Sequence, residues 1–175
     1  QLPNIVGDSI GIYKNASFIM DAMKKRGIAN VQLLTPATNK AVPAVYGEVI
    51  TPGATQTIIF YAQYDGQPVN AAQWAKGLSP FEPKLLTTSL EQNGSFIEFP
   101  TAGKAFDPQW RIYGRSASDD KAGVMAILNA YDAIVKSGYL KTKMLRVHFN
   151  TCIGLYRSFI LQVLITVFVS IRSFM

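Results

Sequence analysis

The amino-acid sequence predicts an α/β fold, with a mixed sheet and flanking helices in three layers. A segment with apolar residues at helical spacing comes first, and three strand-like runs of β-branched and aromatic residues follow it. A second helical segment then precedes one more strand-like run. This order favours a sheet with at least one crossover connection. A chain of 175 residues, 49% of them hydrophobic, is long enough to bury such a core.

Two helices are predicted from their apolar faces. The first covers residues 12–26 and stops at Gly27, a residue typical of a helix end. Its apolar face consists of Ile12, Ala16, Ile19 and Met23. The second helix ends at Gly138 and has the larger apolar face, made of Val124, Ile127, Leu128, Tyr131, Ile134 and Val135.

Four strands are predicted for the main sheet, and they lie at residues 31–34, 44–50, 57–62 and 144–149. The unbroken apolar run at 57–62 is typical of a strand buried on both faces. Two shorter strands are predicted at 96–99 and 110–113, on either side of a loop. Residues 66–95 are rich in Gly, Pro, Asn and Ser and are predicted to be irregular, with Trp74 and Phe81 as anchors.

The charge distribution argues against nucleic acid as a partner. The net charge is +6, but the basic residues are scattered, and Lys24-Lys25-Arg26 is the only run. That run falls at a predicted helix end, where cations are favourable without any ligand. The excess arises because no Asp or Glu follows Asp132.

The chain has one cysteine, Cys152, and one histidine, His148. A single cysteine excludes an internal disulfide and a zinc site built from several cysteines. Cys152 has no evident orienting acid near it, so we interpret it as a small, partly buried side chain rather than a nucleophile. His148 falls inside a predicted strand, which favours a packing or hydrogen-bonding role.

An α/β domain is predicted at residues 1–150 and a divergent apolar tail at 151–175. Residues 158–171 carry no charge. As an α-helix they would extend about 20 Å, short of a bilayer core of about 30 Å, which disfavours a membrane anchor. The alternatives are a buried helix or strand, out-of-frame sequence foreign to the fold, and a surface for self-association.

The first candidate site follows the third strand, at the edge where open α/β sheets commonly place their sites. Residues two apart in an extended chain point to the same side, so Gln63 and Asp65 project together. A histidine at position 63 would be oriented as a metal ligand by Asp65, and with Gln63 the acid loses that task. The alternative is an Asx-type turn that ends the strand.

The second candidate site, Ser116-Ala117-Ser118-Asp119-Asp120, precedes the stronger helix. One interpretation is structural, because Ser116 and Asp119 have the spacing of a capping box and acids complement the helix dipole in a first turn. The other is that one carboxylate bridges two metal ions about 3.5–4 Å apart, using both of its oxygens.

With the residues around them, these two sites resemble the aminoacylase/carboxypeptidase family of zinc metallopeptidases, which includes glutamate carboxypeptidase and carnosine-type dipeptidases. The resemblance covers residues from about 3 to 149 and is strongest to the dipeptidase branch. It is carried by Val45-Tyr46-Gly47-Glu48, residues 61–69, Trp74, Ser79-Pro80-Phe81-Glu82-Pro83, Tyr113-Gly114-Arg115 and Asp119-Asp120-Lys121.

The resemblance implies part of the α/β catalytic domain of a zinc exopeptidase that hydrolyses small peptides or N-acyl amino acids. The family's His-x-Asp motif falls on Gln63 and Asp65. Gln63 thus stands where a zinc ligand is expected, and Asp65 is the catalytic-site acid that would orient it. Asp119 maps to the carboxylate that bridges the two zinc ions.

Two departures from the family pattern predict weak or absent zinc binding and an inactive, incomplete catalytic domain. Gln63 offers a neutral amide in place of an imidazole, which is a poor donor for zinc. The family has a pair of Glu residues, a general base and a ligand, just beyond the next strand. This chain reads Asn150-Thr151-Cys152-Ile153-Gly154 there. The alternative is a non-catalytic binding protein with the same α/β shell.

Overall fold

The computed structural model describes residues 2–5, 7–35 and 43–138 and the backbone of residues 145–152. Its helices are α1 (Ser9–Lys25) and α2 (Lys121–Lys136). Its strands are β1 (Ala29–Leu34), β2 (Ala44–Val49), β3 (Gln56–Gln63), β4 (Lys84–Leu86), β5 (Phe96–Ile97), β6 (Arg111–Tyr113) and β7 (Leu145–Cys152). Both helices, the four strands of the main sheet and the two short strands therefore fall where the sequence predicts them.

The main sheet is mixed and has the strand order β1-β2-β7-β3. β1 pairs with β2 and β2 pairs with β7 in antiparallel fashion, whereas β3 and β7 are parallel. The connection from β3 to β7 contains α2, so it is the predicted crossover. Since β3 and β7 are in register from Gln56↔Leu145 to Gln63↔Cys152, both strands end at the same edge of the sheet.

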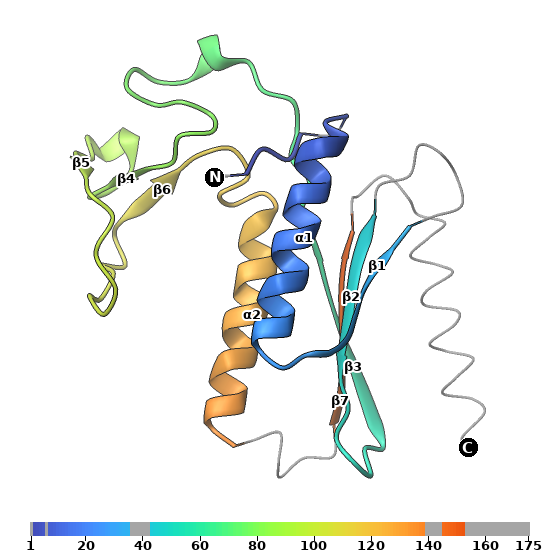
Figure 1. Cartoon of the computed structure of the whole chain (residues 1–175). Coiled ribbons are helices and arrows are strands. Elements are labelled where there is room, and N and C mark those ends of the chain that lie inside the picture. The colour runs from blue at the N-terminus through green and yellow to red at the C-terminus, as the bar shows by residue number, and fades with distance from the viewer. Residues whose placement is uncertain (1, 6, 36–42, 139–144, 153–175) are drawn as a thin grey trace.

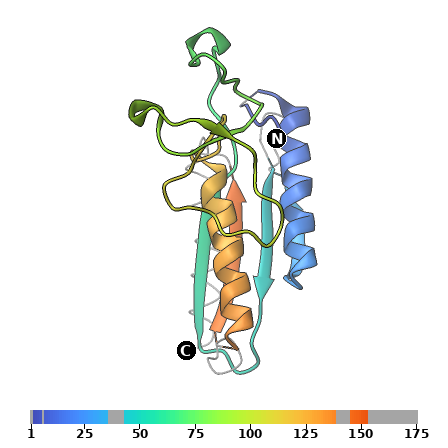
Figure 2. The ribbon, with the colours of Figure 1, turned by 90° about the vertical axis from the view of Figure 1, so that its left-hand side faces the viewer.

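α1 and α2 lie side by side against one face of this sheet (Figures 1 and 2). α1 contacts β1 and β2, and α2 contacts β3. The predicted α/β class with a mixed sheet and flanking helices is confirmed. The described helices form one layer on that sheet, and the helix layer expected on the opposite face is not among the described residues.

The core lies between the two helices and the sheet. All four predicted core residues of α1, namely Ile12, Ala16, Ile19 and Met23, are at most 5% exposed. In α2 the buried residues are Val124, Leu128 and Tyr131, whereas Val135 is exposed and its predicted place in the apolar face is wrong. Each fully buried large apolar side chain contributes about 1.5–3 kcal/mol to stability, so these two faces hold the layers together.

α1 begins three residues earlier than the sequence predicts, because Asp8 caps it. The Asp8 carboxylate accepts a hydrogen bond from the Gly11 N–H at 2.9 Å, which satisfies one of the free donors of the first turn. At the other end Gly27 follows the helix with φ +73°, a conformation that glycine adopts without the steric cost of a Cβ.

β3 was expected to be buried on both faces, and this is wrong for the described part of the chain. It lies at one edge of the sheet formed by the four described strands, and β1 lies at the other. Ile58 and Tyr61 are 41% and 40% exposed, whereas Ala62 is buried against α2. An unbroken apolar run cannot by itself distinguish a central strand from an outer one that is covered mainly on one side.

The irregular segment 66–95 contains a strand that the sequence did not predict. β4 pairs with both β5 and β6, so the short strands form a separate three-stranded sheet, visible as a lobe away from the main sheet in Figure 1. This lobe is anchored by Leu85 and Leu86, which are fully buried, rather than by Trp74 and Phe81, which are half-buried. β4 reads Lys-Leu-Leu, without the β-branched and aromatic residues that indicated β5 and β6.

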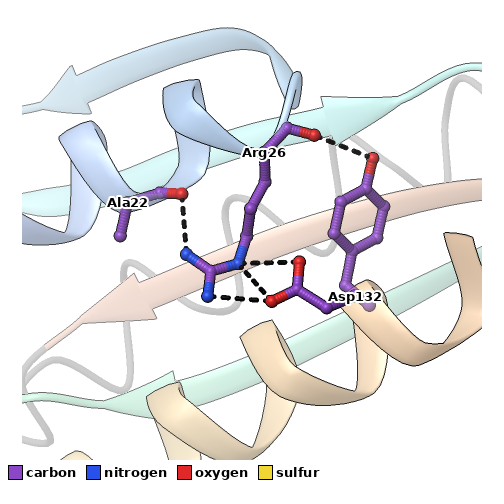
Figure 3. Close-up of polar contacts among 4 residues, drawn as sticks. Ala22, Arg26 and Asp132 are labelled. Carbon is purple, nitrogen blue, oxygen red and sulfur yellow. Dashed lines mark hydrogen bonds and ion pairs between the residues drawn. The ribbon is translucent and has the colours of Figure 1, made fainter. Parts of the chain in front are cut away.

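The end of α1 is fastened to α2 by an ion pair (Figure 3). The guanidinium Nε of Arg26 donates to both carboxylate oxygens of Asp132 at 3.0 Å, and its Nη2 lies 2.9 Å from Oδ2. Its Nη1 donates to the carbonyl of Ala22 at 3.0 Å. The basic run at residues 24–26 therefore lies at a helix end, as predicted, and its last member also joins the two helices.

The predicted apolar tail lies outside the described residues from position 153 onward, and β7 extends two residues past the predicted boundary at 150. Among the described residues no helix is long and apolar enough to cross a membrane. His148 lies within β7, as the sequence predicts.

Candidate functional site

The first candidate motif follows the carboxyl end of β3. Gln63, the last residue of that strand, is half-buried, and Asp65 is 7% exposed. Between them, the Tyr64 ring is fully buried in the core and its hydroxyl donates a hydrogen bond to the carbonyl of Pro43. Tyr64 thus fixes the chain at the point where it leaves the sheet, directly before Asp65.

The second candidate motif precedes α2, and the capping-box interpretation of it is wrong. The residue at the helix N-cap position is Asp120, whose side chain makes no capping hydrogen bond. Ser116 is 3% exposed, has φ +61° and uses its hydroxyl in a contact far along the sequence. The peptide bond between Asp119 and Asp120 is cis. The segment from Ser116 to Asp120 is therefore a loop set against another part of the fold.

The two motifs meet through the N-terminal segment. The side-chain amide of Asn4, which is completely buried, donates to the carbonyl of Tyr64 at 2.8 Å. Its Oδ1 accepts from the hydroxyl of Ser116 at 3.1 Å, and its backbone carbonyl accepts from the Gly66 N–H at 2.8 Å. Ile5 continues this contact as a parallel bridge to Gly66. Segments separated by 60 and 112 residues in the sequence are joined at one residue.

The approach of the two loops leaves room only for glycine at position 66. A Cβ added there would overlap the hydroxyl of Ser116 and lie 2.9 Å from Oδ1 of Asn4. Gly66 lets the loop after β3 pack directly against the loop before α2.

Three carboxylates share this edge of the sheet. A hydrogen bond with Asp119 is the main cause that raises the pKa of Asp120 to about 6, followed by burial and by the negative charges of Asp119 and Asp65. The charge of Asp65 acts on Asp120 only because the two loops are held together. The structure therefore brings Asp65 to the Asp119–Asp120 pair, as the sequence predicted, while their roles in catalysis and metal binding remain predictions.

Two basic side chains flank the carboxylates and connect them to other segments. The Lys121 ammonium donates to the carbonyl of Leu2 at 2.5 Å, and burial lowers the pKa of this side chain to about 8. Arg115 donates through its guanidinium to the carbonyl of Pro68 at 3.0 Å and through its backbone N–H to the carbonyl of Pro80 at 2.7 Å. The site is thus tied to the N-terminal segment on one side and to the lobe on the other.

The donor set does not fit a pair of zinc ions. Among the described residues no three His, Cys, Asp or Glu side chains are grouped so as to hold a metal ion. Position 63 supplies an amide, and β7 ends at Cys152 beside it with no acidic residue later in the sequence. Zinc in proteins takes three or four nitrogen, sulfur or carboxylate donors. Asp119 and Gln63 alone do not provide them.

Sequence reasoning found the three acids but missed the residues that join them. Asn4 and Tyr64 carry no signal for this role in the sequence, because each acts through contacts with distant segments. The one available signal was the Ser116-Ala117-Ser118 run, for which helix capping was one of two interpretations. Its first residue instead donates to Asn4.

Comparison with known proteins identifies the fold. No protein-family model and no curated protein sequence matches the chain. Among solved structures, the di-peptidase Dug1p from Saccharomyces cerevisiae is similar with a TM-score of 0.60 and 16% identity, over 87% of this chain and 29% of that one. The M20 family metallo-carboxypeptidase Sso-CP2 from Sulfolobus solfataricus is similar with a TM-score of 0.57 and 24% identity, over 86% of this chain and 28% of that one.

The chain thus spans less than a third of the length of either solved structure. At these identities the likeness concerns the fold and not the activity. The α/β arrangement expected from the sequence is confirmed, and it is a fold that these two peptidases share over part of their length.

Proposed function

We propose that this chain carries part of the active site of a peptidase-like hydrolase for small peptides or N-acyl amino acids, and that it does not hydrolyse them by itself. Two loops carry the acids, residues 64–66 after β3 and residues 116–120 before α2, and we call them the carboxylate loops. The observation that carries the proposal is that they meet at the carboxyl end of β3. The fold is shared with a di-peptidase and a metallo-carboxypeptidase, and this supports the choice of substrate class.

The proposed roles follow from the environment of each acid. Asp119 is exposed and therefore accessible to a substrate or metal ion from solvent, whereas Asp65 is buried. Asp120, with its pKa of about 6, holds a proton that it donates to Asp119 under mildly acidic conditions. We assign Asp119 as the metal-ligand position, Gln63 as a weakened ligand position and Asp65 as the acid that would orient a ligand there.

The proposed inactivity follows from the missing base. Hydrolysis of an amide needs a group that takes a proton from the attacking water. The resemblance expects a Glu pair after the strand that corresponds to β7, and no Asp or Glu follows Asp132 in this sequence. The three acids at the site are expected to contribute to metal binding. None of them is expected to act as the missing general base. Zinc, for which one Glu of that pair would be a ligand, should bind weakly.

The experiment combines an assay of hydrolysis with a measurement of zinc binding by the purified 175-residue chain. We expect no release of amino acids from dipeptides or N-acetyl amino acids, with or without zinc. We expect weak zinc binding by calorimetry that Asp119→Asn abolishes. Asp21→Asn, which removes an exposed acid from α1, is the matched control and should leave the binding unchanged.

Two results would contradict the proposal. Binding of two zinc ions together with turnover that Asp119→Asn eliminates would show that the chain is active alone. Zinc binding that Asp119→Asn and Asp21→Asn affect equally would show that the carboxylate loops are not a metal half-site.

A further inference from the structure

We propose that Asn4 is the positioning residue of the carboxylate site, and that its buried amide sets the spacing between Asp65 and the Asp119–Asp120 pair. Nothing in the family resemblance assigns a role to this residue. The inference rests on the proposed function for what the carboxylates do. The spacing itself is a geometric property that is measurable without hydrolysis or metal.

The contacts of Asn4 divide between the two loops. Its Nδ2 and its backbone carbonyl bond to the loop after β3, at Tyr64 and Gly66. Its Oδ1 bonds to the loop before α2, at Ser116. One rigid, planar amide group therefore connects both loops, and a change in its position would move one loop relative to the other.

The chemistry of this position requires an asparagine. The side chain is completely buried, so both of its polar atoms need partners, and the two loops supply one acceptor and one donor. Aspartate would keep the acceptor for Ser116 but lose the donor to the Tyr64 carbonyl. It would also place a second negative charge in the interior near Asp65, where burial makes charge costly. Alanine would remove the hydrogen bonds that Asn4 makes to the Tyr64 carbonyl and to the Ser116 hydroxyl.

The close packing around Asn4 turns these hydrogen bonds into a fixed distance. Gly66 has no room for a Cβ against Ser116 and Asn4, so its backbone packs directly against the Ser116 hydroxyl and the Asn4 amide. Because this hydrogen-bonded contact is closely packed, a displacement of one loop also displaces the other. Asp65 and Asp119 lie one and three residues from these contact points, and their separation follows from the same contact.

The N-terminal segment is held in place independently of the carboxylate loops. The Asn15 side chain, on α1, donates to the carbonyls of Pro3 and Gly11 at 2.7 Å each. Asn15 is 5% exposed and thus resembles Asn4 in burial and in chemistry, but neither of these bonds goes to a carboxylate loop. This residue provides the matched control for a buried asparagine in the same region.

The test is amide hydrogen exchange on the full chain without added metal. Asn4→Ala should speed exchange at the Gly66 and Ala117 amides by about tenfold, and leave the amides in the middle of α1 and α2 unchanged. Asn15→Ala should speed exchange in the first turn of α1 and leave Gly66 and Ala117 as in the unmodified chain. Ser116→Ala, which removes one of the bonds, should speed exchange at Ala117 more than at Gly66.

The outcomes separate a positioning role from a general contribution to stability. Unchanged exchange at Gly66 and Ala117 in Asn4→Ala would overturn the proposal. Acceleration by the same factor at all amides would overturn it as well, because it would reflect global unfolding alone. If Asn4→Ala does not fold, Ser116→Ala decides the question by the same criteria. Failure of this test would leave the proposed function untouched, since no arm of it measures zinc or hydrolysis.

Discussion

The guanidinium of Arg26 binds the carboxylate of Asp132, 106 residues later in the sequence, and so connects the end of α1 to the C-terminal half of α2. The hydroxyl of Tyr131 lies 3.5 Å from the carbonyl of Arg26 and adds to the same connection. The two helices therefore cover the sheet as one layer. α2 begins directly after Asp119 and Asp120, so this contact helps to hold in place the helix that borders the candidate site.

Arg26→Lys is expected to destabilise the protein by about 0.5–1 kcal/mol. A lysine cannot reproduce the forked contact with Asp132 or the bond to Ala22. The loss stays small because the two side chains are 22% and 39% exposed and water screens their attraction. Urea denaturation at low salt measures it. Lys25→Met, on the same exposed turn, should change stability less, and an equal loss in both variants would show that the fork contributes nothing.

The stability of the protein should depend on pH through Asp120. The pKa of this carboxyl is about 6 in the folded protein and near its ordinary value of 3.8 when unfolded, so the folded state binds more protons between these values. The contribution is fully present below about pH 4 and is lost as the pH rises through about 6. The free energy of unfolding should fall over this window by about 1 kcal/mol, less than the shift alone implies, because solvent screens the group.

Asp120→Asn tests this pH dependence, because asparagine resembles the protonated acid. The variant should lack the decrease between about pH 4 and 6 and should be the more stable form at neutral pH. Urea denaturation across the pH series gives the comparison, with Asp107→Asn as a control on an exposed acid in the lobe. The same decrease in Asp120→Asn and the unmodified chain would assign it to other groups.

Gln63→His should tighten zinc binding by at least about tenfold without producing hydrolysis. The new imidazole would lie at the end of β3, two residues before Asp65, where the acid can orient it. Calorimetry measures the affinity, and Gln67→His places the same group on an exposed residue just beyond the turn. Equal gains in the two variants would exclude position 63 from the site. Adding Asp65→Asn should remove most of the gain at position 63.

Gly66→Ala should destabilise the protein by about 1–3 kcal/mol, since a methyl group would overlap Ser116 and press on Asn4. The loss is measured by urea denaturation. In a Ser116→Gly background the hydroxyl is gone, so the same substitution should cost less, though contact with Oδ1 of Asn4 remains. An unchanged cost in that background would show that the two loops do not press on each other at this point.

The secondary structure was predictable where a local pattern extends over several turns or residues. The apolar faces of α1 and α2 repeat often enough to define both helices, and the runs of β-branched residues define the main strands. β4 was missed because Lys84-Leu85-Leu86 contains no β-branched or aromatic residue, unlike β5 and β6, and because its pairing joins segments with no local relation. The prediction that β3 is buried on both faces was wrong because the position of a strand in the sheet is set by the whole sheet, not by its own residues.

The sequence by itself determined which residues are candidates for the chemistry of the site. Asp65, Asp119 and Asp120 stand out by their positions after a strand and before a helix, and the departures from the family pattern at Gln63 and at residues 150–154 are visible without any coordinates. Only the tertiary structure decided how the acids meet, through Asn4. Its bonds join residues 60 and 112 positions away, and no local preference encodes contacts that form only when distant segments pack together.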